Sequence, residues 1–121
     1  MQNDSSKFKI NLDSAIFYTS DIEKAITFYE SLGLKLEYRD KNFVSFIFNN
    51  GAKLGIKDAK EEREVPGKQT VFISVQNIEP FYENLKENNF NILKELTVQD
   101  WGKNFSILDP DNNKVQFVEK K

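Results

Sequence analysis

Asp109 and Asp111 have the spacing of a catalytic carboxylate pair. They stand in the segment Asp109-Pro110-Asp111-Asn112, and this composition is typical of a tight turn. Proline presets the backbone angle that the second turn position needs, and Asp and Asn side chains bond back to nearby main-chain groups. The turn explains both carboxylates, so we assign them no catalytic role.

The chain of 121 residues contains no histidine and no cysteine. Histidine is the usual general base near neutral pH and the commonest metal ligand, and cysteine supplies thiolate nucleophiles, thiolate metal ligands and disulfides. Any chemistry must therefore use carboxylates, lysine, tyrosine or serine.

Charge and hydropathy argue against several classes of partner. The 17 basic and 19 acidic residues give a formal net charge of −2, and no basic run interleaves with aromatic residues, so we expect no nucleic-acid partner. No apolar run approaches the length of a membrane span, and the polar start of the chain lacks a secretory signal. We therefore expect a cytoplasmic protein without a membrane partner.

The first half of the chain is predicted to form a strand, a helix and three further strands. Ser20 and Glu23 have the spacing of a capping box, and apolar residues then recur with helical period as far as Leu32. Gly33 follows at the position where helices commonly end, so the sequence predicts a helix over residues 21–32. The four strands are predicted over residues 9–18, 34–39, 43–48 and 52–57.

The second half is predicted to repeat this order after a charged linker, residues 58–68. Asn77 is the expected cap of a helix over residues 78–88, and Asn89 stands at its C-terminal end. Glu119, near the end of the chain, is interpreted as a solvent-exposed charge. Strands are predicted over residues 70–76 and 90–98 and in a final hairpin over residues 101–119.

The two halves match at a shift of 56 positions, which places Ile22 on Ile78 and Gly33 on Asn89. This is an internal repeat of a strand–helix–three-strand unit. The sequence therefore predicts an α+β fold of two tandem βαβββ modules, residues 9–57 and 69–120, within a single domain of residues 1–121.

Two blocks of sequence resemble a known family. The first runs from Ser20 to Leu34 and includes Phe28-Tyr29, and the second is Trp101-Gly102, Phe105, Asp109-Pro110-Asp111-Asn112-Asn113 and Val115-Gln116-Phe117. Both blocks are similar to the vicinal oxygen chelate superfamily, which includes glyoxalase I, extradiol dioxygenases, fosfomycin-resistance enzymes and bleomycin-resistance proteins. The resemblance implies that the two modules form a curved mixed sheet with a concave cleft and with the helices outside.

The resemblance also implies where metal ligands would stand in metal-dependent members. Three of these positions correspond here to Ser14, Thr70 and Gln116, and the fourth corresponds to Gly55. Neutral hydroxyls and an amide are poor ligands for a divalent cation, which prefers imidazole, carboxylate or thiolate donors. We therefore expect no metal and no other cofactor, as in the metal-free bleomycin-resistance-like members.

Strand alternation indicates what the implied cleft would offer. If the side chains at the ligand positions point into the cleft, so do those of the residues two positions along each strand. Trp101 is selected for its place in the loop before the last hairpin, where relatives often line the mouth of the cleft. This mixture of aromatic, aliphatic and hydrogen-bonding groups suits an organic ligand. The competing interpretation is that the aromatic residues fill a collapsed core. The predicted ligand-binding residues are Ser14, Ile16, Tyr18, Thr70, Phe72, Ser74, Trp101 and Gln116.

Three functional hypotheses follow. The favoured one is a metal-free protein that binds and sequesters a small organic molecule, in the manner of a bleomycin-resistance protein. The second is a superfamily enzyme of lyase, isomerase or dioxygenase type with a different site, for which Tyr18, Glu37 and Glu119 would be the candidate groups. The third is a regulatory or interaction module whose cleft has closed. The resemblance further implies a homodimer.

Overall fold

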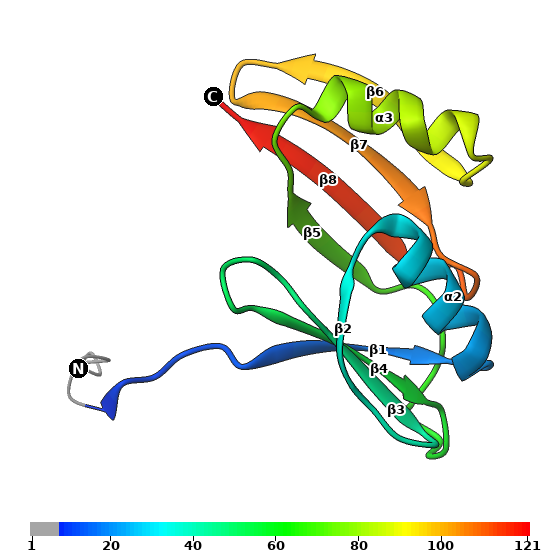
Figure 1. Ribbon diagram of the computed structural model, residues 1–121. Helices are drawn as coiled ribbons and strands as arrows, with labels where there is room; N and C mark the ends of the chain where they lie inside the picture. The colour runs from blue at the N-terminus through cyan, green and yellow to red at the C-terminus, as the bar shows by residue number, and fades with distance from the viewer. Residues whose placement is uncertain (1–7) are drawn as a thin grey trace.

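The chain folds as two successive modules of the same architecture in the computed structural model, which describes residues 8–121 (Figure 1). Each module has the order strand, helix, three strands. The second module starts its strand and its helix 56 residues after the first, at Thr70 against Ser14 and at Ile78 against Ile22. This confirms the α+β fold of tandem βαβββ units. The first module comprises β1 (Ser14–Thr19), α2 (Ile22–Leu32), β2 (Lys35–Arg39), β3 (Phe43–Ile47) and β4 (Lys53–Asp58), and the second comprises β5 (Thr70–Ser74), α3 (Ile78–Glu87), β6 (Ile92–Gln99), β7 (Gly102–Leu108) and β8 (Lys114–Lys120).

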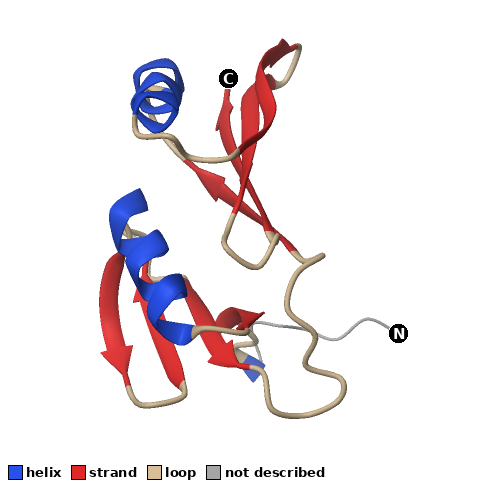
Figure 2. Ribbon diagram, turned by 90° about the vertical axis from the view of Figure 1, so that its right-hand side faces the viewer, coloured by secondary structure: helices blue, strands red, loops and turns tan. Residues whose placement is uncertain are grey.

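Each module contains one mixed four-stranded sheet. The strand orders are β1-β4-β3-β2 and β5-β8-β7-β6. In each sheet the first strand of the module runs parallel to the last, and the remaining neighbours are antiparallel. The helices α2 and α3 lie on the same side of the molecule, each over its own sheet (Figure 2). The curved surface therefore consists of two sheets, and in residues 8–121 no strand pair joins them.

The helix α2 begins one residue later than the capping box predicts. Asp21, rather than Ser20, is the N-cap, and its side chain accepts a hydrogen bond from the main-chain nitrogen of Lys24 at 3.2 Å. Ser20 instead donates hydrogen bonds to Asp111, as described below. Gly33 ends the helix in the left-handed conformation at φ 108°, which confirms the predicted end and explains the glycine there.

The start of α3 depends on a side chain that the sequence analysis placed in solvent. Asn77 occupies the N-cap position but makes no side-chain capping bond. The Glu119 carboxylate accepts instead from the main-chain nitrogens of Asn77, at 2.9 Å, and Ile78, at 3.2 Å. A carboxylate at a helix N-terminus satisfies free N–H groups and interacts favourably with the helix dipole. The interpretation of Glu119 as a solvent-exposed charge was therefore wrong.

The predicted strands agree with the observed ones within about two residues, except at the start of the chain. The predicted strand over residues 9–18 begins only at Ser14, because Lys9 has a positive φ of 52° and residues 10–13 pair with no other strand among the described residues.

The core is one cluster of apolar side chains that continues from one module into the other. In module 2, Phe105 is fully buried and packs against Tyr82 and Phe117, with ring centroids 4.9 and 5.1 Å apart. Between the modules, Phe28 of α2 meets Phe90 edge-on at 5.5 Å. The relative position of the modules is thus supported by apolar packing as well as by polar contacts.

The turn between β7 and β8, residues 109–113, is the main polar contact between the modules, and we call it the junction turn. Asp109 is 5% exposed. Its carboxylate accepts from the Tyr29 hydroxyl of α2 at 2.7 Å, from Asn113 at 2.9 and 3.0 Å, and from the Asp111 nitrogen at 2.9 Å. Burial and then the charge of Asp109 raise the pKa of Tyr29, so this hydroxyl remains a proton donor. The turn therefore explains Asp109 only in part, since its carboxylate also binds module 1.

Asp111 makes the second set of contacts to module 1. Its carboxylate accepts from the Thr19 hydroxyl at 2.5 Å and from the Ser20 nitrogen and hydroxyl at 3.0 and 2.8 Å. These contacts fix the end of β1 against the end of β7. Ser20 therefore acts at the module junction and not as the cap of α2.

The linker between the modules is held in place by Glu64 and Gly67. The Glu64 carboxylate, although part of a charged segment, is 5% exposed and accepts from Lys57 Nζ at 2.6 Å and from the nitrogens of Lys60 and Glu61. Gly67 has φ 89°, and a Cβ atom there would lie 2.5 Å from the main-chain oxygen of Asp111. The linker thus passes directly against the junction turn.

Glu64 should make stability depend on acid pH. Its hydrogen bonds, led by that from Lys57, lower its pKa from the ordinary 4.5 to about 2. A carboxyl with a depressed folded-state pKa stabilises the fold above its unfolded pKa and loses this contribution as the pH falls through its folded pKa. We expect Glu64→Gln to lower the Tm at neutral pH, and this difference to shrink between pH 4.5 and 2. Calorimetry with the exposed Glu62→Gln as control checks this; a pH-independent difference would contradict it.

Candidate functional site

The helix-free face of module 1 has an apolar centre. Ile16, Gly55 and Ser45 are register partners on β1, β4 and β3, and they share this face because partners in a ladder project to the same side. The ring of Phe43 and the side chain of Ile16 close over Gly55, since a Cβ atom there would meet them at 2.8 and 3.3 Å. Ile16 is nonetheless 41% exposed, so this face offers an accessible apolar surface.

The helix-free face of module 2 combines an aromatic ring with hydrogen-bonding groups. Phe72 of β5, Gln116 of β8 and Ser106 of β7 are register partners, and by alternation Thr70 and Ser74 share their face. Phe72 is 64% exposed. Its ring therefore does not fill a collapsed core, which was the competing interpretation of the aromatic residues.

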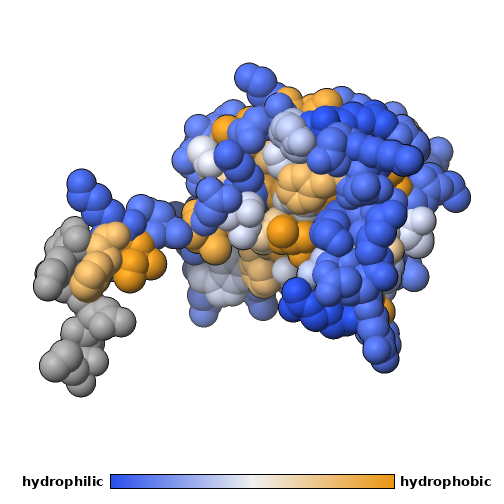
Figure 3. Space-filling view, turned by 90° about the horizontal axis from the view of Figure 1, so that it is seen from below, coloured by the Kyte–Doolittle hydropathy of each residue, from blue (hydrophilic) through white to orange (hydrophobic). Residues whose placement is uncertain are grey.

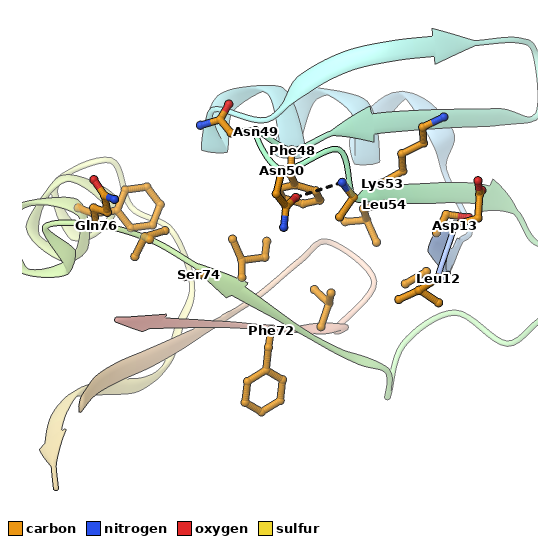
Figure 4. Close-up of a pocket in the computed structure, with 17 residues that line it drawn as sticks. Leu12, Asp13, Phe48, Asn49, Asn50, Lys53, Leu54, Phe72, Ser74 and Gln76 are labelled. Atoms are coloured by element: carbon orange, nitrogen blue, oxygen red, sulfur yellow. Dashed lines mark hydrogen bonds between the residues drawn. The ribbon is translucent and has the colours of Figure 1, made fainter. Parts of the chain in front are cut away.

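A cavity of about 850 Å³ lies between the modules, bordered by β1 and the start of β4 on one side and by β5 on the other. This volume falls within the range of pockets for small organic ligands. Figure 4 shows the Phe72 ring on the opposite side of β5 from Asn50 and Leu54. The cavity therefore opens on the helix side of β5, where Val71, Ile73 and Val75 line it.

Three of the eight predicted ligand-binding residues border this cavity, namely Ser14, Phe72 and Ser74, although the Phe72 ring points away from it (Figure 4). The other five, Ile16, Tyr18, Thr70, Trp101 and Gln116, are not among its lining residues. The cavity also uses residues that the sequence analysis did not select, including the turn residues Asn49 and Asn50, together with Lys53 and Phe81. The dipeptide Asn49-Asn50 before Gly51 marks a turn in the sequence, but nothing in it indicates that this turn faces β5.

Trp101 lies at the far end of module 2, in the turn between β6 and β7. It is 44% exposed, and its main-chain oxygen accepts from the nitrogen of Lys121 at 3.1 Å. Its position at this end of the sheet keeps it away from the border between β1 and β5.

The positions that would hold a metal do not form a suitable donor set. Ser14 and Gly55 belong to the sheet of module 1, and Thr70 and Gln116 to that of module 2. Their donors are two hydroxyls and one amide, and Gly55 has no side chain, so the charge of a divalent cation would stay uncompensated. Within residues 8–121, no three His, Cys, Asp or Glu side chains are grouped so that they could hold a metal ion.

Two of the three candidate catalytic groups are engaged in structural contacts. Glu119 caps α3, as described above. Glu37 pairs with Lys53 at 3.2 Å on the helix-free face of module 1, where both side chains are about one-third exposed. Tyr18 is half-buried, and its main-chain nitrogen donates to the Gln69 side chain at 3.3 Å. In these contacts Tyr18, Glu37 and Glu119 do not bind one another.

Apolar side chains are also exposed on the segment before β1 and on the body of the protein. The segment that leads into β1 extends away from the body of the protein (Figure 3), and its residues Ile10 and Leu12 are 61% and 85% exposed. On the body, the view in Figure 3 shows an apolar patch surrounded by hydrophilic residues. Exposed apolar surface of this kind marks sites for ligands or partners.

Comparison with known families identifies the chain. Residues 11–117 match the model of the Glyoxalase/Bleomycin resistance protein/Dioxygenase superfamily, and this match spans nearly all of the sequence. The protein belongs to this superfamily. No curated protein matches the chain by sequence.

Solved structures of several kinds share the fold. An antibiotic-binding protein, TnmS3 from Streptomyces sp. CB03234, superimposes with a TM-score of 0.83 at 18% identity, over 93% of this chain and 97% of that one. A bleomycin resistance determinant encoded on the transposon Tn5 gives a TM-score of 0.74 at 16% identity, over 93% and 99%. Lactoylglutathione lyase from Agrobacterium tumefaciens gives 0.75 at 16% identity, over 90% and 92%.

In the described part of the chain, no helix combines the length and apolar character that crossing a membrane requires.

Proposed function

We propose that this protein binds a small organic molecule without a metal, at the border where β1 of module 1 approaches β5 of module 2. The observation that carries the proposal is Phe72, whose ring is 64% exposed beside the amide of Gln116 on β8. An exposed aromatic ring next to uncharged hydrogen-bonding groups suits stacking and orientation of a flat ligand. We further propose that the protein acts in the cytoplasm by sequestering its ligand and not by converting it.

Two further observations support this proposal. The positions at which metal-dependent relatives hold their ligands carry Ser14, Gly55, Thr70 and Gln116, which suit hydrogen bonding or close approach better than cation binding. Two of the solved relatives named above are an antibiotic-binding protein and a bleomycin resistance determinant.

A thermal-shift screen of the chelator-treated protein tests the proposal. The panel would contain metal-free bleomycin and flat aromatic antibiotics. A ligand that binds only the folded state at about 100 times its Kd stabilises the protein by about 2.7 kcal/mol, so a true ligand raises the Tm by several degrees. We expect at least one such ligand, with the same Tm shift when chelator is present. A panel without any binder, or binders that all need added metal, would contradict the proposal.

We also propose that the protein is a homodimer that covers the free edges of β1 and β5. Within residues 8–121, β1 pairs only with β4 and β5 only with β8, so each sheet has one open edge at the border between the modules. Open edges invite pairing with another chain. The exposed apolar side chains Ile16 and Phe72 on these same strands would be partly covered by a second copy, which would then complete the ligand site.

Sedimentation equilibrium at micromolar concentration checks the assembly. We expect a species of about twice the chain mass of 14.1 kDa, and we expect Ile16→Lys, which places a charge beside the open edge, to favour the monomer. The variant Val98→Lys serves as control, because Val98 is also exposed but lies on β6. A single species of 14.1 kDa for the unmodified protein would refute the dimer.

A further inference from the structure

Three side-chain amides form a chain of hydrogen bonds across the helix-free face of module 2. Gln116 Nε2 on β8 donates to Asn104 Oδ1 on β7 at 3.3 Å, and Asn104 Nδ2 donates to Gln99 Oε1 at the end of β6 at 2.9 Å. Asn104 is 2% exposed, whereas Gln116 is only half-buried. The buried Asn104, in the middle of this series, therefore fixes the orientation of the half-buried Gln116 amide. Gln116 Oε1 and the second hydrogen of Gln116 Nε2 take no part in these two hydrogen bonds.

Ser106 lies directly beside Gln116. It is the register partner of Gln116 on β7, and it is fully buried. Its hydroxyl makes no hydrogen bond to any atom of residues 8–121. An unsatisfied buried hydroxyl is energetically unfavourable, so Ser106 can donate to a ligand group that displaces the side chains covering it beside Gln116.

The uncharged character of this group limits the ligand chemistry. Gln99, Asn104, Ser106 and Gln116 carry no charge, and moving an ion from water onto neutral groups costs more than moving a neutral amide. Lys94 of β6 is the register partner of Ser106 on its other side, but its side chain is exposed to solvent. Lys114 of β8 shares the face of Gln116, but its register partners are Thr70 and Leu108 and not Phe72 or Ser106. The accessible polar contact for a ligand beside Phe72 is therefore the Gln116 amide, and the Ser106 hydroxyl next to it is buried.

We infer that Gln116 and Ser106 recognise a neutral lactam or primary carboxamide attached to a flat aromatic ring. The ring would stack on Phe72, the ligand N–H would donate to Gln116 Oε1, and the ligand carbonyl would accept from the Gln116 amide or the Ser106 hydroxyl. A side-chain amide and a lactam are complementary in this way, because each offers one donor and one acceptor side by side. This inference rests on the proposed function, since it names the class of molecule that the same site binds.

A titration with three small probes tests the inference, followed by nitrogen–proton correlation spectra that include the side-chain amide signals. The probes are 2-quinolone, a neutral aromatic lactam; 1-methyl-2-quinolone, which lacks the N–H; and 2-naphthoate, an anion of similar size. We expect 2-quinolone to shift the side-chain amide signals of Gln116 and Asn104 and to bind about tenfold more tightly than its N-methyl form. We expect 2-naphthoate to bind no better than the N-methyl form.

Matched variants separate recognition from folding. Gln116→Met retains the size of the side chain but removes its hydrogen bonds, and it should reduce the preference for 2-quinolone to less than about twofold. Ser106→Ala should reduce it in part and leave the backbone spectrum unchanged. Equal binding of the two quinolones to the unmodified protein near Phe72, or tighter binding of 2-naphthoate, would overturn the lactam inference while the proposed function stands. No shift near Phe72 with any probe would overturn both.

Discussion

Replacing Asp109 by alanine is expected to lower the free energy of unfolding by about 3 kcal/mol or more, because several buried donors lose their acceptor together. The carboxylate accepts from Tyr29, from Asn113 twice and from the Asp111 nitrogen, all at 2.7–3.0 Å. Since Asp109 also connects the two modules, the loss should weaken the junction as well as the turn. Urea denaturation followed by circular dichroism measures it.

Asp40 provides a matched control for this experiment. It occupies another turn and accepts from the main-chain nitrogens of Asn42 and Phe43 and from the Tyr38 hydroxyl, but it is exposed. Asp40→Ala should therefore cost much less than Asp109→Ala, since water replaces the lost acceptor. Tyr29→Phe, which leaves the other bonds of Asp109 intact, should give an intermediate loss. Equal losses for Asp109→Ala and Asp40→Ala would contradict the role of the junction turn.

Truncating Phe72 to alanine is expected to weaken binding of any ligand found in the screen by tenfold or more. Removing a central aromatic contact commonly costs about 2 kcal/mol or more of binding free energy. Because Phe72 is 64% exposed, the same change should alter the stability of the chain itself very little. Calorimetric titration of the variant, together with its Tm, separates the two effects.

Val98→Ala is the control for the Phe72 variant. Val98 is 70% exposed and lies on β6, away from the border between β1 and β5, so ligand affinity should not change. Phe72→Tyr retains the ring and should retain most of the affinity. If Phe72→Ala binds the ligand as tightly as the unmodified chain does, Phe72 is not part of the site.

The order of the elements could be predicted from the sequence because its signals are local. Helical periodicity ending at Gly33 and the left-handed residue Asn89 depend on residues close in the chain, and the repeat after 56 positions compares two such local patterns. The structure bears each of them out. The caps were predicted less well. Glu119 lies 41 residues from Ile78, whose nitrogen it binds, and no local pattern indicates that contact.

The relation between the modules could not be predicted for the same reason. Tyr29 and Asp109 stand 80 residues apart, and a tight turn accounts for Asp109 so well that the sequence gives no sign of a second role. Alternation correctly groups Phe72 with Gln116 on one face. It does not indicate that the cavity of about 850 Å³ lies on the other side of β5, because that depends on how the two sheets are placed.

Calorimetric titration of the chelator-treated protein with the best compound of the screen tests the central claim most directly. The claim is that this chain binds a small organic molecule through uncharged and aromatic groups and without a metal. We predict saturable binding whose affinity is unchanged by added zinc, nickel or manganese and is lost in Phe72→Ala. Binding that appears only after metal is added, with the metal held by Ser14, Thr70 or Gln116, would contradict it.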